Sequence, residues 1–116
     1  MKFSNCTGAL GGFALALGTL FAAPAAQAID ADAAQGLARQ NGCFKCHSVD
    51  KDKDGPAFKA VAAKYKGKAD AEDHIVHHLT SGEKAKFPDG HEEAHKIIKT
   101  KDPAELKNLA DWILAQ

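Results

Sequence analysis

Apolar residues recur at helical spacing in four separate segments of the chain. They are Ala33, Ala34, Leu37 and Ala38 in segment 30–41, Phe58, Val61, Ala62 and Tyr65 in 58–65, Ala71, Ile75, Val76 and Leu79 in 70–81, and Leu106, Leu109, Ala110 and Ile113 in 103–115. Spacings of three and four residues place such side chains on one face of a helix. The pattern therefore predicts four helices, the first of which runs into Cys43.

Polar and turn residues stand where these helices are expected to begin and end. Asp30 or Asp32 is available as a cap for the first helix, and Asp102 followed by Pro103 suits the start of the last one. Gly67 and Gly82 follow the second and third segments, where a glycine commonly stops a helix. The boundaries are thus predicted from local residues alone.

The stretch from Glu83 to Thr100 has a weaker pattern. Residues 87–90 read as a turn, and residues 91–100 are expected to make one or two helical turns with only Ala94, Ile97 and Ile98 to bury. Nowhere does the sequence alternate between apolar and polar residues as a half-buried strand would. We therefore expect an all-α fold.

The first 28 residues have the order of a secretory signal peptide. Lys2 precedes an apolar run at about 8–23, and Ala26-Gln27-Ala28 follows as a small-residue cleavage site. The run is shorter than the roughly 20 apolar residues that span a bilayer. We expect cleavage after Ala28, export to a bacterial periplasm, no stable membrane insertion afterwards, and one domain at 29–116. Removing 28 of 116 residues leaves 88, so the core is small unless a bound group adds apolar surface.

Charge and cysteine content narrow the classes of function. The chain has 15 basic and 15 acidic residues, and no basic stripe suggests a nucleic-acid partner. Cys6 leaves with the signal peptide, so the exported domain keeps only Cys43 and Cys46. Two cysteines three positions apart are compatible with a disulfide, half of a metal site, or covalent haem attachment.

The residue after the second cysteine favours haem attachment. Cys43-Phe44-Lys45-Cys46-His47 puts two thiols and an imidazole on one turn of chain. The thiols can then bond the two vinyl groups of a haem while the ring of His47 reaches its iron. A thioredoxin-like site would need a βαβ context, and a zinc site a second pair of ligands.

Three segments resemble the small, monohaem, bacterial class I cytochromes c. They are the helix leading into the Cys43–His47 motif, the stretch Gly55-Pro56-Ala57-Phe58-Lys59, and residues 106–113. The resemblance implies three main helices plus short helices around one covalently attached haem c. It also implies that the Pro56 carbonyl accepts a hydrogen bond from the outer ring nitrogen of His47. The first and last helices are expected to cross near Gly36 on one and Leu109 or Trp112 on the other.

The chain departs from this family at the second axial ligand. The family supplies a methionine shortly before the last helix, whereas the only methionine here is Met1, which leaves with the signal peptide. By the family pattern His95 takes that position, with His91, one helical turn earlier, as second choice. Lys96, Asn108 or a vacant position remain open. The other three histidines, at 74, 77 and 78, are expected on the surface.

The function expected from these features is electron transfer and not catalysis. A periplasmic carrier would pass one electron between redox protein partners through an exposed haem edge, with Lys45, Lys51 and Lys53 as a docking surface or an ordinary solvated face. A haem protein that binds O2, NO or CO at a labile His95 or His91 is the alternative. A peroxidase is not expected, because the chain is short and shows no distal Arg and His. The sequence leaves open whether the protein is a subunit of a larger oxidoreductase.

Overall fold

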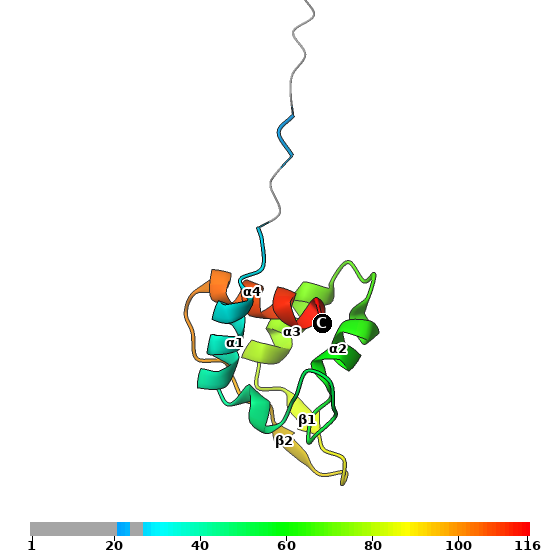
Figure 1. The fold of residues 1–116 in the computed structure, drawn as a ribbon. Coiled ribbons are helices and arrows are strands. Elements are labelled where there is room, and N and C mark those ends of the chain that lie inside the picture. The colour runs from blue at the N-terminus through cyan, green and yellow to red at the C-terminus, as the bar shows by residue number, and fades with distance from the viewer. Residues whose placement is uncertain (1–20, 24–26) are drawn as a thin grey trace, which may run out of the picture.

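The computed structural model describes residues 21–23 and 27–116, so most of the predicted signal peptide lies outside it. The elements in chain order are α1 (Ala31–Gln40), the 3₁₀ turn η1 (Cys43–Lys45), α2 (Phe58–Tyr65), α3 (Ala71–Thr80), β1 (Lys84–Lys86), β2 (Glu92–Ala94) and α4 (Pro103–Leu114). Figure 1 shows the four helices gathered into one globule from which the short hairpin extends. The predicted helical fold is confirmed. Within the described residues, no helix combines the length and hydrophobicity needed to cross a bilayer.

Side chains that the sequence offers as caps hold the first and last helices. Asp30 accepts a hydrogen bond from the backbone N–H of Ala33 at 2.9 Å, and Asp102 accepts one from Ala104 at 2.9 Å. Pro103 occupies the first turn of α4, where its missing N–H leaves no hydrogen bond unmade. These local contacts explain why the predicted and observed ends agree closely.

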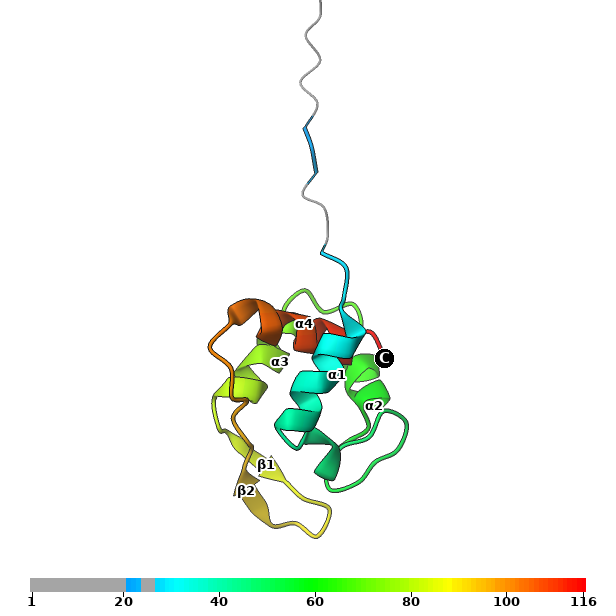
Figure 2. The ribbon, with the colours of Figure 1, turned by 60° about the vertical axis from the view of Figure 1, so that its left-hand side comes forward.

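Helix α4 packs against the other three helices and carries much of the core. It contacts α1, α2 and α3, and its residues Leu109, Ala110, Trp112 and Ile113 are buried. Figure 2 shows α1 crossing in front of it. The side chain of Asn108 makes two hydrogen bonds to the backbone of Asp30. Its Oδ1 accepts from Asp30 N at 2.9 Å, and its Nδ2 donates to Asp30 O at 2.8 Å. The start of α1 is thereby fixed to α4.

The crossing of α1 and α4 does not need a glycine. A Cβ added at Gly36 would meet no atom within 4 Å, whereas Ala34 and Ala38 are 1% and 0% exposed. Ala33, which the periodicity also placed on this face, is exposed. The small residues that face the core are therefore the two alanines on either side of Gly36, and Gly36 itself makes no close contact there.

The helical turns expected in 91–100 are absent. Instead β1 and β2 form an antiparallel pair in which Lys84 faces Ala94 and Lys86 faces Glu92. The predicted turn is present, with Gly90 N donating to Phe87 O at 2.9 Å. A helix fails here because the segment bonds to distant parts of the chain: His95 N donates to Glu83 O at 2.8 Å, and Ile98 N to Leu79 O at 2.9 Å.

A buried asparagine attaches this segment to α1. Asn41 is 3% exposed, and its Oδ1 accepts a hydrogen bond from Lys99 N at 2.8 Å. Its Nδ2 donates to Leu37 O at 3.0 Å. Both polar atoms of the amide are thus paired away from water. The hydrogen bonds to Glu83, Leu79 and Asn41 thus all fix residues 95–99, which directly follow β2.

Asn41→Ala is expected to lower the free energy of unfolding by about 1–3 kcal/mol, because it removes the partner of the part-buried N–H of Lys99 and the hydrogen bond to Leu37. Denaturant unfolding monitors the loss, and amide hydrogen exchange at Lys99 should become faster. The exposed neighbour Gln40→Ala is the control and is expected to change little. Equal stability of the two variants would contradict this role of Asn41.

Candidate functional site

The residues of the Cys43–His47 motif lie on one tight turn at the end of α1. Gly42 enters this turn at φ 70°, a left-handed conformation that favours glycine. The N–H groups of Cys46 and His47 then both donate to the carbonyl of Cys43, at 3.2 and 3.0 Å. Cys43 and Cys46 are free thiols, and burial raises the pKa of Cys43. The turn therefore presents two free thiols and one imidazole side by side.

The ring of His47 is held in one orientation. Its Nδ1 lies 2.7 Å from the carbonyl oxygen of Pro56, the contact that the family resemblance implies. Because a carbonyl only accepts, Nδ1 carries the proton and Nε2 keeps a free lone pair. The ring also stacks on Phe58, with centroids 5.2 Å apart and planes 18° apart. Nε2 is thus prepared to bind a metal.

Two hydrogen bonds fix the loop that places the Pro56 carbonyl next to this ring. Gly55 N donates to Cys46 O at 2.7 Å, and Ala57 N donates to the Asp52 carboxylate at 2.7 Å. Gly55 also passes very close to the imidazole, since a Cβ built there would lie 2.8 Å from Nδ1 and 2.9 Å from Nε2 of His47. Real Cβ atoms essentially never come within 3.0 Å of such atoms. The loop and the ring therefore fit only with glycine at this position.

The ring of His95 lies near that of His47. The two ring centroids are 6.3 Å apart. An imidazole nitrogen lies about 2 Å from a transition metal that it binds and roughly 1 Å from the centre of its own ring, so two imidazoles on opposite sides of one metal have ring centres about 6 Å apart. The spacing of these rings therefore suits one metal atom between them.

The environment of His95 also suits a ligand. Burial is the main cause that lowers its pKa, and the nearby rings of His78 and His47 lower it further. A lowered pKa keeps the imidazole neutral at pH 7, as metal binding requires. Its Nδ1 is buried and has no hydrogen-bond partner among the described residues.

Two of the other ligand candidates, His91 and Asn108, are turned to different partners, whereas the amine of Lys96 lies near Gly42 at the attachment turn. His91 lies beyond the turn of the hairpin, where its ring stacks on Phe87 with centroids 4.3 Å apart. Its Nδ1 pairs with Asp89 and its Nε2 with Glu93 at 3.1 Å, and the hydrogen bond to Asp89 is the main cause that raises its pKa. Asn108 is occupied by the backbone of Asp30. Of these residues, His95 is the one that the fold brings to His47.

His78 belongs to the site although the sequence placed it on the surface. Its ring centroid is 4.0 Å from that of His95, and its Nδ1 lies 2.5 Å from a carboxylate oxygen of Glu83. This hydrogen bond lowers the pKa of Glu83. His78 follows the buried Ile75 by three residues, so the helical spacing itself placed it on the inner face. His74 and His77 are exposed as expected.

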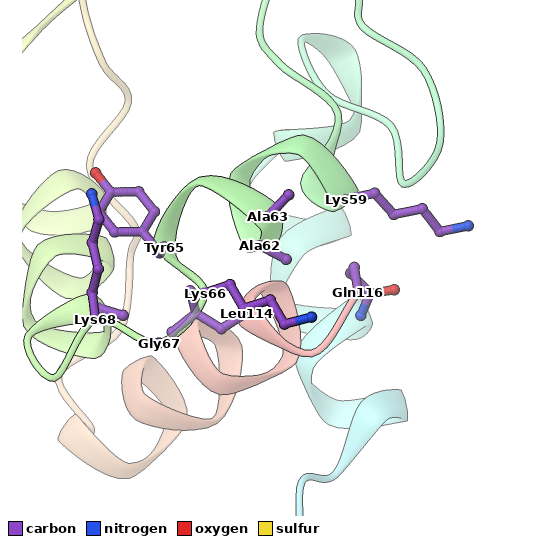
Figure 3. Close-up of a pocket in the computed structure, with 10 residues that line it drawn as sticks. Lys59, Ala62, Ala63, Tyr65, Lys66, Gly67, Lys68, Leu114 and Gln116 are labelled. Carbon is purple, nitrogen blue, oxygen red and sulfur yellow. The ribbon is translucent and has the colours of Figure 1, made fainter.

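A surface cavity of about 510 Å³ lies elsewhere, between the end of α2 and the end of α4. Tyr65, Leu114 and the lysines Lys59, Lys66 and Lys68 are among its lining residues (Figure 3). None of the residues of the attachment turn lines it, and neither histidine 47 nor 95 does. The size of this cavity is therefore no guide to the site.

Comparison with known proteins agrees with the motif and the fold. The model of the family described as Cytochrome c matches residues 31–116. Cytochrome c-552 of Nitrosomonas europaea is 37% identical over 98 residues, which cover 84% of this chain and 92% of that protein. Cytochrome c-551 of Pseudomonas aeruginosa is 32% identical over 102 residues, 88% of this chain and 90% of the relative.

A solved structure resembles the chain more closely in sequence. The crystal structure of the class 1 cytochrome MtoD from Sideroxydans lithotrophicus ES-1 has 67% sequence identity and a TM-score of 0.73. It covers 76% of this chain and 97% of its own. The wild-type cytochrome c552 of Nitrosomonas europaea follows with 33% identity and a TM-score of 0.57, over 70% of this chain and 96% of that one.

Gly55→Ala is expected to push the His47 ring away from Pro56, because the added Cβ would overlap the imidazole, and to cost about 1–3 kcal/mol of stability. The imidazole ¹⁵N NMR signals of His47 measure the loss of its hydrogen bond, and denaturant unfolding measures the free energy. Gly36→Ala is the matched control, since a Cβ there meets nothing within 4 Å. Unchanged His47 signals in Gly55→Ala would contradict the steric argument.

Proposed function

Since the chain belongs to the cytochrome c family, as a small class I member with one covalently attached haem c, we propose that it is a periplasmic electron carrier whose haem iron is bound by His47 and His95. Proteins of this family transfer electrons between redox protein partners. The observation that carries the proposed ligation is the 6.3 Å spacing of the two rings in a chain whose only methionine is Met1.

The residues around the attachment turn fit a haem. Cys43 and Cys46 supply the two thiols for the vinyl groups, and the free Nε2 of His47 supplies the first axial nitrogen. Pro56 holds that ring by its carbonyl, and His95 supplies the second nitrogen. The bound iron contributes a one-electron change of oxidation state. The protein's own part is to fix both rings in place.

A second imidazole in place of a thioether has a direct consequence for the reduction potential. Nitrogen donors stabilise ferric iron more than a methionine sulfur does, and axial ligand identity is a main control on haem potential. The proposed carrier therefore has a lower potential than relatives with histidine and methionine ligands. It fits a different pair of redox partners in consequence.

The alternative, a gas-binding protein with a labile distal ligand, receives no support from the relatives. It required the segment that bears His95 to be loosely held. The segment is instead fixed by three hydrogen bonds of 2.8–2.9 Å, which its backbone N–H groups donate to the carbonyls of Glu83 and Leu79 and to the side chain of Asn41. A ligand on such a segment is expected to stay on the iron in both oxidation states.

Docking of a partner would use the surface near the attachment turn. Lys45 and Lys51 are exposed there, while the amine of Lys53 donates to the carbonyl of Phe44 at 2.6 Å. All three lysines are exposed, and a hydrogen bond to a neutral carbonyl leaves the charge of an amine in place, so each is available to a partner. Lys53 also holds the attachment turn through its hydrogen bond.

Absorption spectra of the ferric and ferrous holoprotein test the ligation. The native protein is expected to be low-spin in both states and not to bind carbon monoxide. His95→Ala should become high-spin and bind carbon monoxide when reduced, because it opens one axial position. His91→Ala is the matched control and should retain the native spectra. A low-spin His95→Ala protein would overturn the proposed ligation, and a native ferrous form that binds carbon monoxide would favour the gas-binding alternative.

Export is tested by the amino terminus of the mature protein. Mass spectrometry of the protein from the periplasmic fraction should give a chain that begins at Ile29 and carries one haem, because signal peptidase cleaves after small residues such as Ala28. Ala28→Leu should block this processing. A mature chain that keeps residues 1–28 would contradict both cleavage and release into the periplasm.

A further inference from the structure

The proposed ligation leaves one nitrogen of His95 without a role. When Nε2 of a histidine binds a metal, its Nδ1 carries a proton and almost always donates it to a carboxylate, a carbonyl or water. His47 meets this rule through Pro56. Nδ1 of His95 is buried and has no partner within the described part of the chain. An acceptor must therefore come from a group that already lies against this ring.

His78 is that neighbouring group, and Glu83 determines which of its two ring nitrogens carries a proton. The carboxylate of Glu83 can only accept, so the 2.5 Å contact assigns a proton to Nδ1 of His78. In a neutral imidazole the other nitrogen then has a free lone pair and accepts hydrogen bonds. In its neutral form His78 therefore offers an acceptor, and its ring is packed against His95.

The two rings are in contact but are packed face to face, with centroids 4.0 Å apart and planes tilted by 42°. An N–H···N hydrogen bond between two imidazoles needs ring centres about 5 Å apart. The bond therefore forms only when His95 turns toward the iron and its ring moves about 1 Å away from His78. Glu83 holds both residues: its carboxylate accepts a hydrogen bond from Nδ1 of His78, and its backbone carbonyl accepts one from the backbone N–H of His95 at 2.8 Å.

We propose that His78 accepts a hydrogen bond from Nδ1 of His95 in the holoprotein, and that Glu83, His78 and His95 form a positioning relay on the second axial ligand. This inference rests on the proposed ligation by His95. A proton shared with His78 increases electron donation from His95 to the iron. The relay therefore stabilises the oxidised state and lowers the reduction potential, in addition to holding the ring in place.

The test compares His78→Phe with His77→Phe in the holoprotein. Phenylalanine keeps an aromatic ring against His95 but has no acceptor. His77 is the matched control, because it lies on the same helix with its Nε2 3.6 Å from Glu83 yet is exposed. Spectroelectrochemistry measures the potential, and ¹⁵N-histidine NMR of the ferrous protein measures solvent exchange of the His95 Nδ1 proton.

His78→Phe should stay low-spin, exchange that proton faster, and shift the equilibrium toward reduction by about threefold, which is about 30 mV for one electron. Glu83→Gln should shift it in the same direction by less, and it replaces His78→Phe in the comparison should that variant fail to fold. His77→Phe should leave both measurements unchanged.

Two different failures can be told apart. A His95→Ala protein that remains low-spin overturns the ligation, and the relay with it. If His95→Ala becomes high-spin as expected but His78→Phe has the native potential and proton exchange, the relay is wrong and the ligation stands. Equal shifts in His78→Phe and His77→Phe also overturn the relay, because they indicate a general charge effect.

Discussion

The hydrogen bond from Nδ1 of His47 to the carbonyl of Pro56 determines how the site is oriented. It fixes the tautomer, and with the stacking on Phe58 it fixes the direction in which Nε2 points. The loop that supplies this carbonyl is in turn tied to the attachment turn by Gly55. Because the turn, the loop and α2 all meet at one imidazole, a shift in any of them moves the metal-binding nitrogen.

The opposite side of the site depends on long-range hydrogen bonds and very little on apolar burial. Between β1 and α4, Ile98 is buried while Ile97 remains 52% exposed. The segment nevertheless has a defined position, because Asn41, Leu79 and Glu83 each bond to its backbone. This arrangement lets a polar, charged hairpin be followed by a half-buried histidine at a defined position without a core of its own.

A domain of this size obtains a core by placing one helix against all the others. The last helix, α4, contacts α1, α2 and α3, and Trp112 joins the aromatic rings of Phe44 and Phe58 beside His47. The protein core and the site are therefore continuous. A covalently attached haem extends the same apolar surface, which agrees with the limited burial that a chain of this length can reach alone.

The sequence by itself determined the features that depend on neighbours along the chain. The helices follow from spacings of three and four apolar residues, their ends from Asp30, Asp102 and Pro103, and the cofactor from five consecutive residues at 43–47. Each of these is a local property, since the residues concerned act within one or two turns of backbone.

The tertiary structure alone decided which distant residues meet. It replaced the expected helical turns in 91–100 with a hairpin, because hydrogen bonds to Leu79 and Glu83 competed successfully with local ones. It also separated His95 from His91 and brought His78 against His95. Composition and periodicity do not predict such pairings, because the pairings arise when α3 and the hairpin pack together in the folded chain.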